Sequence, residues 1–560
     1  MEKTEETPQE PEIEKSREES SQAVDLDRIL IEELGQFGLY QLRGLLLAIV
    51  VVVFGAWAAV EYIFTTARIE TRCLIPVCEN AATVEFSPSW LGNAVPLTDS
   101  GRFDNCQRFA NTSATDVTGT CPALLFNQNN VISCEEYVYA NAETVVYDYD
   151  LACDEWRRSL IGSVRTVGVL LAMPLTGYVS DRWGRRTALV LNAVNTAWLG
   201  AIRYFANTYI GFLISQFTEA MFGAGGFNCT YILVMELMGP KYRVAAGATL
   251  NTFFAVGQVT MGLIAWGVPT WRQLTLALYV PQFITISYIW IMAESVRWYM
   301  SKGRYEESEK VLLEVARVNK KTLSMKSLEA LRESAEEEKR RQELAKAQKA
   351  QEPLLLVQLW RNKRVLLRCC VSPVWWITTT FIYYGLSINS VNMSGNKYLN
   401  YVAVSAVEIP GFWTSFLLMG IVGRKPVLIG AFWICAACQV AYIFMPNNLY
   451  GVSLTVYLIG KYAIAMVMTA VYVYTAELYH TKHRNTLFAF ASMMGRIGAI
   501  VAPLTPAFGA ATFEQLPFVL FGGFALVAGL LVLLTPETLG TKFPDTIEEA
   551  NDMGRTKNTS

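Results

Sequence analysis

The chain has 560 residues and a formal net charge of −2, and no basic run with interleaved aromatics that would indicate nucleic-acid binding. Apolar residues make up 52% of the sequence and the mean hydropathy is +0.27, which excludes a soluble assembly of this length. The apolar residues gather in runs of about 20, the length that a helix needs to cross the hydrocarbon core of a lipid bilayer. We therefore expect an all-α membrane protein.

These runs predict twelve transmembrane helices. In chain order they cover residues 43–65, 158–180, 187–205, 209–234, 245–267, 273–293, 367–388, 400–422, 426–446, 451–475, 486–508 and 515–535. The polar, acidic residues 1–42 precede them without the pattern of a cleavable signal peptide. The first part of this tail is rich in Glu, Ser and Pro, a composition typical of disordered segments.

Basic residues in the short loops predict the orientation of the chain. The loops on one side carry Arg182, Arg185, Arg186, Lys241, Arg243, Arg424, Lys425, Lys482 and Arg484. The alternate short loops hold only Arg203, Arg272 and Lys397. Because the basic side of a membrane protein faces the cytoplasm, and the number of spans is even, both termini are expected inside the cell.

The first long loop, residues 66–157, is then extracellular. It contains six cysteines, namely Cys73, Cys78, Cys106, Cys121, Cys134 and Cys153. Six cysteines in an oxidising compartment indicate three disulfides, whose pairing the sequence leaves open. Asn111 begins the sequon Asn-Thr-Ser, which predicts a glycan in the same loop.

The second long loop, residues 295–366, is a cytoplasmic linker. Its stretch Glu333–Lys349 is almost all Glu, Lys, Arg, Gln and Ala, which favours a solvated helix with i,i+4 ion pairs. The predicted domains are a cytoplasmic tail (1–42), a first six-helix half (43–294), this linker, a second half (367–535) and a second cytoplasmic tail (536–560).

Three short signatures recur at a nearly constant offset. Gly184-Arg-Arg returns 239 residues later as Gly423-Arg-Lys. Glu236, with Arg243 after six intervening residues, returns after 241 as Glu477 with Arg484. Glu294 returns 243 residues later in Pro-Glu-Thr. Because all three close an apolar segment, they indicate two homologous halves, the arrangement with which secondary transporters rock about a central site.

The run Gly177-Tyr-Val-Ser-Asp-Arg-Trp-Gly-Arg-Arg186 between two spans resembles the signature of the major facilitator superfamily. The cysteine-rich loop, Thr475-Ala-Glu-Leu-Tyr479 and Pro536-Glu-Thr-Leu-Gly540 are similar to the organic cation, carnitine and organic anion transporters within it (solute carrier family twenty-two). The resemblance runs from about residue 25 to residue 549 and implies the twelve-helix major facilitator fold, with two pseudo-symmetric halves.

The resemblance also implies a charge network that closes a cytoplasmic gate. The residues that fit this role are Asp181, Arg182, Arg185, Glu236, Arg243, Glu477 and Arg484. The alternative is that they serve only as topology charges. The second half has Gly420 where the signature has Asp, so its charge set is smaller.

Ionisable side chains within the spans are costly in hydrocarbon and are candidates for function. They are Glu61, Arg165, Glu219, Glu408, Lys461 and Arg496. Arg496 aligns by resemblance with a position that is Arg in the anion and carnitine branches and Asp in the cation branch. A guanidinium can hold a carboxylate through two hydrogen bonds, which favours a substrate with a negative end. An internal acid holding Arg496 is the alternative.

Glu408 is expected either to hold a substrate ammonium group or to pair with Arg496 or Lys461, and Lys461 matches the carnitine and anion branches. One or two of the aromatics Trp375, Trp376, Tyr383 and Tyr384 are expected to line the site by cation–π contacts. Tyr383 and Tyr384 are favoured because they adjoin an expected bend at Gly385. Glu61 and Arg165 depart from the family pattern and are expected either to form an ion pair between neighbouring helices or to line the cavity. Glu219 favours a structural role.

The two histidines, His480 and His483, are expected in a solvated loop, so no metal site and no intramembrane histidine relay are predicted. No nucleotide-binding motif or nucleophile elbow occurs, and we expect a non-enzyme without cofactors. The sequence predicts a plasma-membrane secondary transporter of a small organic ion, with a carboxylate-bearing zwitterion or an organic anion favoured and sodium or proton coupling left open. An organic cation transporter, and a non-transporting receptor that uses the extracellular loop, are the alternatives.

Overall fold

The computed structural model describes residues 26–79, 84–98, 103–112, 120–333, 335, 336, 340, 355–446, 449–480, 483–540, 544 and 547–553. Three sequence expectations fall wholly or mostly outside these residues: the disordered start of the amino-terminal tail, most of the charged helix at 333–349, and the topology charge at Lys482.

Ten helical segments among the described residues are long and apolar enough to cross a membrane. They are α3 (Leu39–Thr65), α6 (Glu155–Trp183), α8 and α9 (Tyr209–Gly223, Gly226–Leu237), α10 (Pro240–Gly267), α11–η4–α12 (Trp271–Tyr279, Val280–Ser287, Tyr288–Ile291), α17 and η5 (Lys363–Asn389, Ser390–Asn392), α18 and α19 (Lys397–Ala406, Glu408–Ile421), α20 (Arg424–Ile443), α21 (Tyr450–Leu478), and α22–η6–α23 (Arg484–Val501, Ala502–Leu504, Thr505–Ala511).

Two more helices bring the set to a number consistent with the expected twelve. Helix α7 (Arg185–Ile202) carries Asn and Thr side chains that lower its hydropathy, and α24 (Leu516–Val532) is apolar but has only 17 residues. Helix α7 packs against α8 and α9, and α24 packs against α20 and α17, within the same layers as the longer helices. The 3₁₀ turn Arg203–Phe205 (η3) follows α7 directly.

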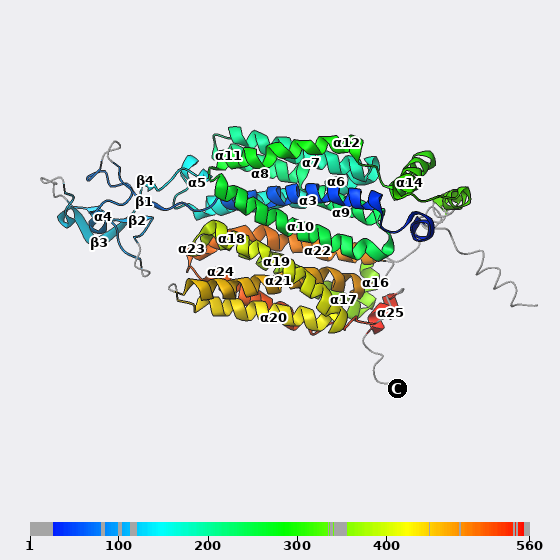
Figure 1. Ribbon diagram of the computed structural model, residues 1–560. Helices are drawn as coiled ribbons and strands as arrows, with labels where there is room; N and C mark the ends of the chain where they lie inside the picture. The colour runs from blue at the N-terminus through cyan, green and yellow to red at the C-terminus, as the bar shows by residue number, and fades with distance from the viewer. Residues whose placement is uncertain are drawn as a thin grey trace, which may run out of the picture.

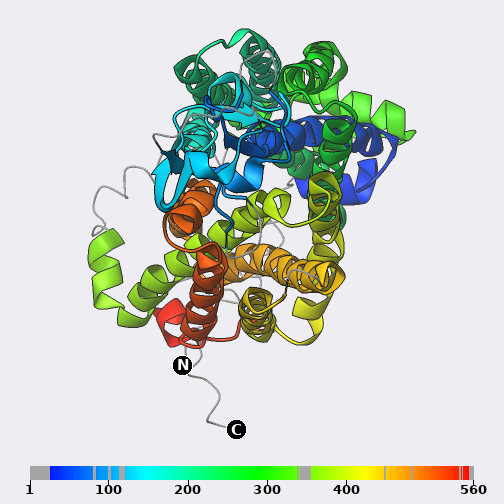
Figure 2. The same cartoon turned by 90° about the vertical axis from the view of Figure 1, so that its left-hand side faces the viewer.

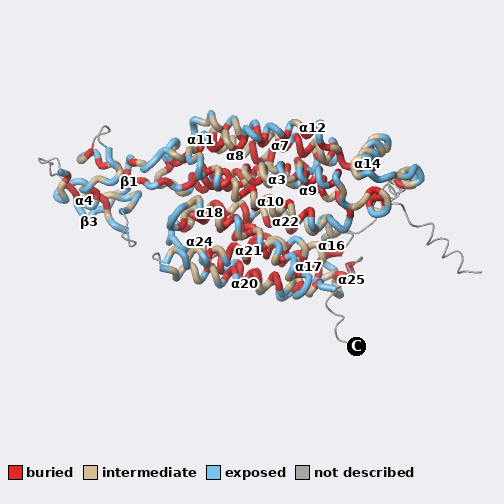
Figure 3. Tube along the Cα trace, in the orientation of Figure 1, coloured by how far each residue is buried: buried red, intermediate tan, exposed pale blue. Residues whose placement is uncertain are grey.

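The helices form two bundles that lie side by side (Figures 1 and 2). Helices α3 to α12, drawn blue to green, make up one bundle, and α17 to α24, drawn yellow to red, make up the other. Within the bundles α6 packs against α8, and α17 against α22. Buried residues follow the contacts between helices, and exposed residues lie on the outer faces (Figure 3). Many of the exposed residues are large and apolar, as expected where lipid replaces water.

The repeated signatures make equivalent contacts in the two bundles. Glu294 accepts a hydrogen bond from the backbone N–H of Arg186 at 2.9 Å, and Glu537 accepts the equivalent bonds from Arg424 and Lys425, each at 3.0 Å. Gly184 and Gly423 precede these helices with φ of 106° and 115°, a region that favours glycine. The local geometry therefore repeats along with the sequence, which supports duplication of the halves.

A disulfide-bonded loop projects from one end of the bundles. It contains two antiparallel pairs, β1 (Thr71–Cys73) with β4 (Tyr137–Tyr139) and β2 (Gln107–Asn111) with β3 (Phe126–Ser133). Its short helices are α4 (Leu91–Ala94), η2 (Ala123–Leu125) and α5 (Val145–Asp148). The three disulfides join Cys73 to Cys134, Cys78 to Cys121 and Cys106 to Cys153.

The opposite end carries the amino-terminal helices α2 (Leu26–Ile29) and η1 (Leu30–Leu34), and the carboxy-terminal α25 (Ile547–Asp552). The linker contributes α13 (Val296–Ser301), α14 (Tyr305–Asn319) and α16 (Leu355–Arg361). The disulfides and the linker thus lie at opposite ends of the bundles, as the predicted orientation requires.

Candidate substrate site and gates

Glu408 and Lys461 form an ion pair inside the second bundle. The Lys461 Nζ lies 2.8 Å from a Glu408 carboxylate oxygen, and both side chains are fully buried between α19 and α21. Lys461 also donates to the carbonyl oxygen of Tyr383 and to the hydroxyl of Ser387, each at 2.8 Å. Of the partners that the sequence left open for Glu408, the structure therefore places Lys461 next to it.

Two further side chains complete this pair. The Tyr383 hydroxyl donates to Glu408 at 2.5 Å, and the Lys461 ammonium lies 3.8 Å from the centre of the Tyr383 ring. Gln258, on α10 of the first bundle, donates from Nε2 to Glu408 Oε2 at 3.0 Å. Helix α17 runs through Gly385 without interruption, and the Phe521 ring occupies the space that a Cβ would need. Gly385 therefore allows close packing against Phe521. The bend expected at Gly385 is absent, so it does not position Tyr383.

A second buried charge cluster lies in the first bundle. Arg203 Nη1 lies 2.8 Å from Glu61 and Arg203 Nη2 lies 3.2 Å from Glu219, and all three side chains are at most 1% exposed. Arg165 pairs with Glu219 as well. Gln216 donates to Glu61 at 3.1 Å and accepts from Arg165 at 3.3 Å. The cluster joins two acids to two bases and is neutral when all four are ionised.

Arg203 is the residue that sequence reasoning missed. Its position at the end of an apolar run suggested a charge in a short outer loop, yet the side chain folds back and is fully buried. There the guanidinium also donates hydrogen bonds to the Tyr279 hydroxyl oxygen at 3.2 Å and to the Ser215 hydroxyl oxygen at 3.3 Å. The signal that could have revealed it is the unmatched pair of acids, Glu61 and Glu219, in neighbouring spans.

Arg496 differs from these bases. Its side chain is half-buried on α22, and among the residues that the structure describes it makes no ion pair and no hydrogen bond. It interacts electrostatically with Tyr472, which also interacts with Tyr384 and with Tyr231 of the first bundle. The guanidinium thus lies where both bundles contribute aromatic hydroxyls, without a carboxylate to neutralise it.

Three aromatic rings from three helices of the second bundle pack together around Tyr472, the residue with which Arg496 interacts. The Tyr472 ring centre lies 4.7 Å from that of Trp376 and 5.9 Å from that of Phe488. Tyr472 is 42% exposed although it belongs to the centrally packed α21. Trp376 was among the aromatic residues expected from the sequence, which favoured Tyr383 and Tyr384. Tyr383 is buried against Glu408, whereas Tyr384 is only partly buried and interacts with Tyr472 and Tyr62.

The expected gating charges lie at the linker end. Arg185 lies 2.8 Å from Asp181 and 3.5 Å from Glu236. Arg243 pairs with Asp27 of the amino-terminal segment at 2.5 Å. In the second bundle Glu477 lies 3.0 Å from Arg424. Arg182 is exposed, and the role of all these residues in gating stays a prediction.

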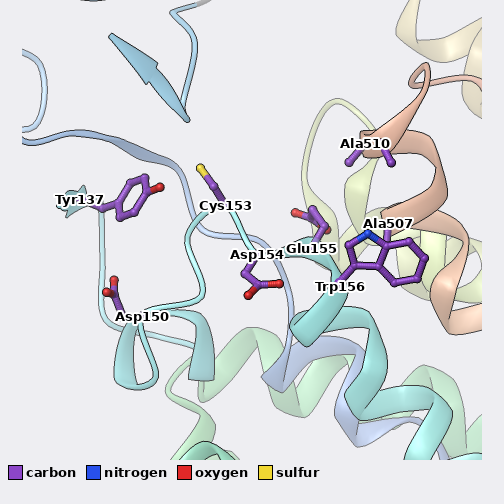
Figure 4. Close-up of a pocket in the computed structure, with 9 residues that line it drawn as sticks. Tyr137, Asp150, Cys153, Asp154, Glu155, Trp156, Ala507 and Ala510 are labelled. Carbon is purple, nitrogen blue, oxygen red and sulfur yellow. The ribbon is translucent and has the colours of Figure 1, made fainter. Parts of the chain in front are cut away.

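The two bundles touch at the disulfide end. The Ser163 hydroxyl donates to the Ile500 carbonyl oxygen at 2.8 Å, and the rings of Trp156 and Phe508 lie 5.3 Å apart. Lys397 lies 3.3 Å from Glu143. A hollow of about 410 Å³ lies between the disulfide loop and α23, with Tyr137, Asp150 and Trp156 around it (Figure 4). The outer ends of the bundles are therefore held together above the charged residues.

One loop expectation is wrong. His480 is 1% exposed, and its ring lies 5.1 Å from that of His483, so this part of the loop is packed rather than solvated. His480 follows Tyr479, whose ring is buried with α16 and α17, and this packing draws the loop inward. The described part of the chain contains no group of three or more His, Cys, Asp or Glu that could hold a metal ion.

The fold matches that of a membrane carrier. The xylose transporter XylE from E. coli, solved in a partially occluded inward open conformation, aligns with a TM-score of 0.58. The alignment covers 90% of this chain and 99% of that chain at 16% identity, so it shows the major facilitator fold. Together with the apolar helices, this shows a multi-pass membrane protein of the major facilitator fold.

The family follows from sequence comparison. The profile of the "Sugar (and other) transporter" family matches residues 120–550. The chain is 30% identical over 536 residues to the organic cation transporter protein of Drosophila melanogaster. It is also 30% identical over 541 residues to solute carrier family 22 member 6 of Mus musculus. Both alignments cover 94% of this chain and 94% of the relative. It is 28% identical to organic cation/carnitine transporter 2 of Rattus norvegicus, with 92% of each covered. The protein belongs to solute carrier family 22 of the major facilitator superfamily.

Proposed function

We propose that this transporter carries a small organic ion with a carboxylate, either a zwitterion or an organic anion, across the plasma membrane. The charge balance of the buried residues supports this proposal. Three acids lie inside the spans, and each is within ion-pairing distance of a buried base. The bases that serve them are Arg165, Arg203 and Lys461, whereas Arg496 has no acidic partner among the described residues.

Arg496 would hold the carboxylate of the substrate. A guanidinium in a site with little water gains most from a bidentate carboxylate partner, and an unpaired one would repel an organic cation. The neighbouring Tyr472, Trp376 and Phe488 offer aromatic faces for the rest of the substrate, including an ammonium group. Glu408 is engaged by Lys461 and Tyr383, so it would hold a substrate ammonium only after that pair opens.

Transport would proceed by alternating access of the two bundles. The contacts Ser163–Ile500, Trp156–Phe508 and Glu143–Lys397 would break when the outer side opens. Charged groups at the linker end would form the closing contacts when the inner side closes, and Asp181, Arg185 and Glu236 would do so in the first bundle. Both termini would lie in the cytoplasm. Substrate binding must favour the occluded state for this exchange to be driven.

The test is uptake of a panel of organic ions into proteoliposomes, with sodium and proton gradients set independently. We expect carboxylate-bearing zwitterions and anions to be taken up and quaternary amines without a carboxylate to be excluded. Arg496→Ala should lower kcat/KM for the carboxylate substrate by about 30-fold or more, because a desolvated charge loses its partner. Arg496→Lys should keep part of the activity, and Arg361→Ala, at an exposed arginine, is the matched control.

Two outcomes would contradict the proposal. Uptake of carboxylate-free cations that is indifferent to Arg496→Ala would favour the organic cation transporter. No uptake of any compound by a folded, correctly inserted protein would favour the non-transporting receptor.

A further inference from the structure

The hollow between the disulfide loop and α23, here called the outer hollow, has one wall from each bundle. Its volume is about 410 Å³. The loop and the start of α6 contribute Tyr137, Asp150 and Trp156, and α23 of the second bundle contributes Ala507. Figure 4 shows Tyr137 and Asp150 on one side of the hollow and Trp156 with Ala507 on the other. Because the walls belong to different bundles, the outer hollow keeps this shape only while the outer ends are in contact.

The charged groups that line the outer hollow are all acidic. They are Asp150, Asp154 and Glu155, and the described lining residues include no lysine or arginine. Two of these acids are compensated by neighbouring arginines outside the lining. Asp154 lies 3.2 Å from Arg157, and Glu155 lies 2.5 Å from Arg158. Asp150 is therefore the acid that can attract a positively charged ligand.

Asp150 has no basic partner among the residues that the structure describes. Its carboxylate accepts one hydrogen bond, from the Tyr139 hydroxyl at 2.5 Å. Desolvation and the negative charge of Asp150 together raise the pKa of Tyr137. The charge of Asp150 thus acts on the lining of the outer hollow, where a cation would meet a carboxylate without a resident counter-ion.

Two aromatic side chains make the outer hollow suitable for an organic cation. Tyr137 is partly buried, whereas Trp156 is 50% exposed, and the Trp156 ring lies 5.3 Å from that of Phe508 on α23. Aromatic faces attract ammonium groups and also cover their apolar substituents. The described lining contains no set of acids arranged to hold a metal ion. The lining therefore favours an organic ammonium ion over an inorganic cation.

A buried hydroxyl lies one helical turn further in. Ser159 is 5% exposed, and its Oγ has no hydrogen-bond partner among the described residues. It lines a narrow cleft between the two bundles, together with Pro506 of α23. Ser159 follows Trp156 by three residues, so the two side chains share one face of α6 at about 5–6 Å. Because buried hydroxyls are normally hydrogen-bonded, Ser159 marks a position for a polar group of a ligand.

We propose that the outer hollow binds a small organic ammonium ion with a hydroxyl arm, and that the bound ion holds the outer ends of the bundles together. The ammonium group lies between Asp150 and the Trp156 ring, and the arm reaches Ser159. A ligand that contacts both bundles makes all of these contacts only when the outer side is closed, so it inhibits opening and is not carried. The site is separate from Arg496 and does not depend on the proposed substrate.

The experiment follows modification of Ser163→Cys by an impermeant thiol reagent added outside proteoliposomes. The full-length chain without this cysteine supplies the background rate. Choline is the probe because it joins a quaternary ammonium to a hydroxyl arm. Choline at about ten times its Kd should lower the rate of modification about tenfold, because a ligand of the closed state alone shifts the equilibrium by one plus the ratio of its concentration to Kd.

Variants of the lining test each contact. Asp150→Asn and Trp156→Ala should each raise the choline concentration for half-maximal protection by about threefold to tenfold, because one removes the charge and the other the aromatic face. Ser159→Ala should abolish the preference for choline over tetramethylammonium, which lacks the hydroxyl. Glu135→Gln, at an exposed acid of the same loop outside the lining, is the matched control and should leave the protection unchanged.

Arg496→Ala separates this site from the proposed substrate site. Protection by choline should persist in this variant at the wild-type concentration, whatever becomes of carboxylate uptake. Protection that is lost in Arg496→Ala but kept in Asp150→Asn would place choline in the central site and overturn the proposal. Choline that leaves the rate of modification unchanged, or raises it, in the otherwise unaltered Ser163→Cys chain would overturn it as well.

Discussion

At the scale of single residues, the interior of this transporter is organised by charge compensation. Glu408, Lys461, Glu61, Arg203 and Glu219 are all fully buried or nearly so, in a medium where an isolated charge is very unfavourable. Each lies next to a group of opposite charge. Arg496 stands apart from this pattern, and this is why the proposed substrate site centres on it.

Removal of one partner from the Glu408–Lys461 pair should be far more harmful than removal of both. Glu408→Gln leaves a buried ammonium without its counter-ion and should destabilise the protein by about 3–5 kcal/mol. The double variant Glu408→Gln with Lys461→Met should recover most of this loss. Thermal unfolding of the detergent-purified variants measures the coupling, and additive effects of the two substitutions would show that the pair is not coupled.

At the scale of elements, the outer loop is a small disulfide-bonded unit with its own buried ion pair. Arg72 and Glu79 lie 2.7 Å apart with both side chains buried, and Arg72 also donates to the Phe86 carbonyl oxygen at 2.9 Å. Together with the three disulfides, these bonds hold the loop that carries the β1–β4 and β2–β3 pairs together.

Asn111, at the end of strand β2, should carry the predicted glycan. Its side chain is exposed, and its Oδ1 accepts a hydrogen bond from Arg108 at 2.9 Å. Treatment of protein expressed in eukaryotic cells with an amidase that removes N-linked glycans should increase its electrophoretic mobility. Asn111→Gln should migrate like the treated protein, and a further shift of this variant on treatment would show that the glycan lies elsewhere.

At the scale of the whole molecule, two bundles of the same construction meet at their outer ends and, through Gln258 and Glu408, between α10 and α19. Glu294 and Glu537 cap equivalent helices through equivalent backbone bonds, which shows how a repeated sequence gives a repeated local structure. The bundles are joined by a limited set of side-chain contacts, so each can move as a unit while these contacts exchange.

Charge reversal at the outer seam should shift the balance between closed and open outer sides. Glu143→Lys places two cations at the Glu143–Lys397 contact. Because this pair is partly exposed, the equilibrium constant between the closed and open outer sides should change by only about twofold to fivefold. The rate at which an impermeant thiol reagent modifies Ser163→Cys from outside should rise accordingly, measured against the same chain without this cysteine. Glu143→Lys with Lys397→Glu should return the rate to its starting value, and an unchanged rate in the single variant would contradict the seam.

The sequence by itself determined the features that depend on local composition. Apolar runs of bilayer length placed the membrane helices, with α7 and α24 near the limit because one is polar and the other short. The recurrence of Gly184 and Gly423 indicated the duplication of the two halves, and six cysteines in one loop predicted its disulfides.

Only the tertiary structure decided which charged groups meet. The sequence places Arg203 in a short loop, but helix packing brings its side chain to Glu61, 142 residues away in the chain. Arg243 meets Asp27, and Glu408 meets Lys461 and Gln258, because segments distant in sequence become neighbours in space. Hydropathy and spacing act within one segment, whereas the pairing of buried charges is set by the low dielectric between several packed helices, where each ion must find a partner.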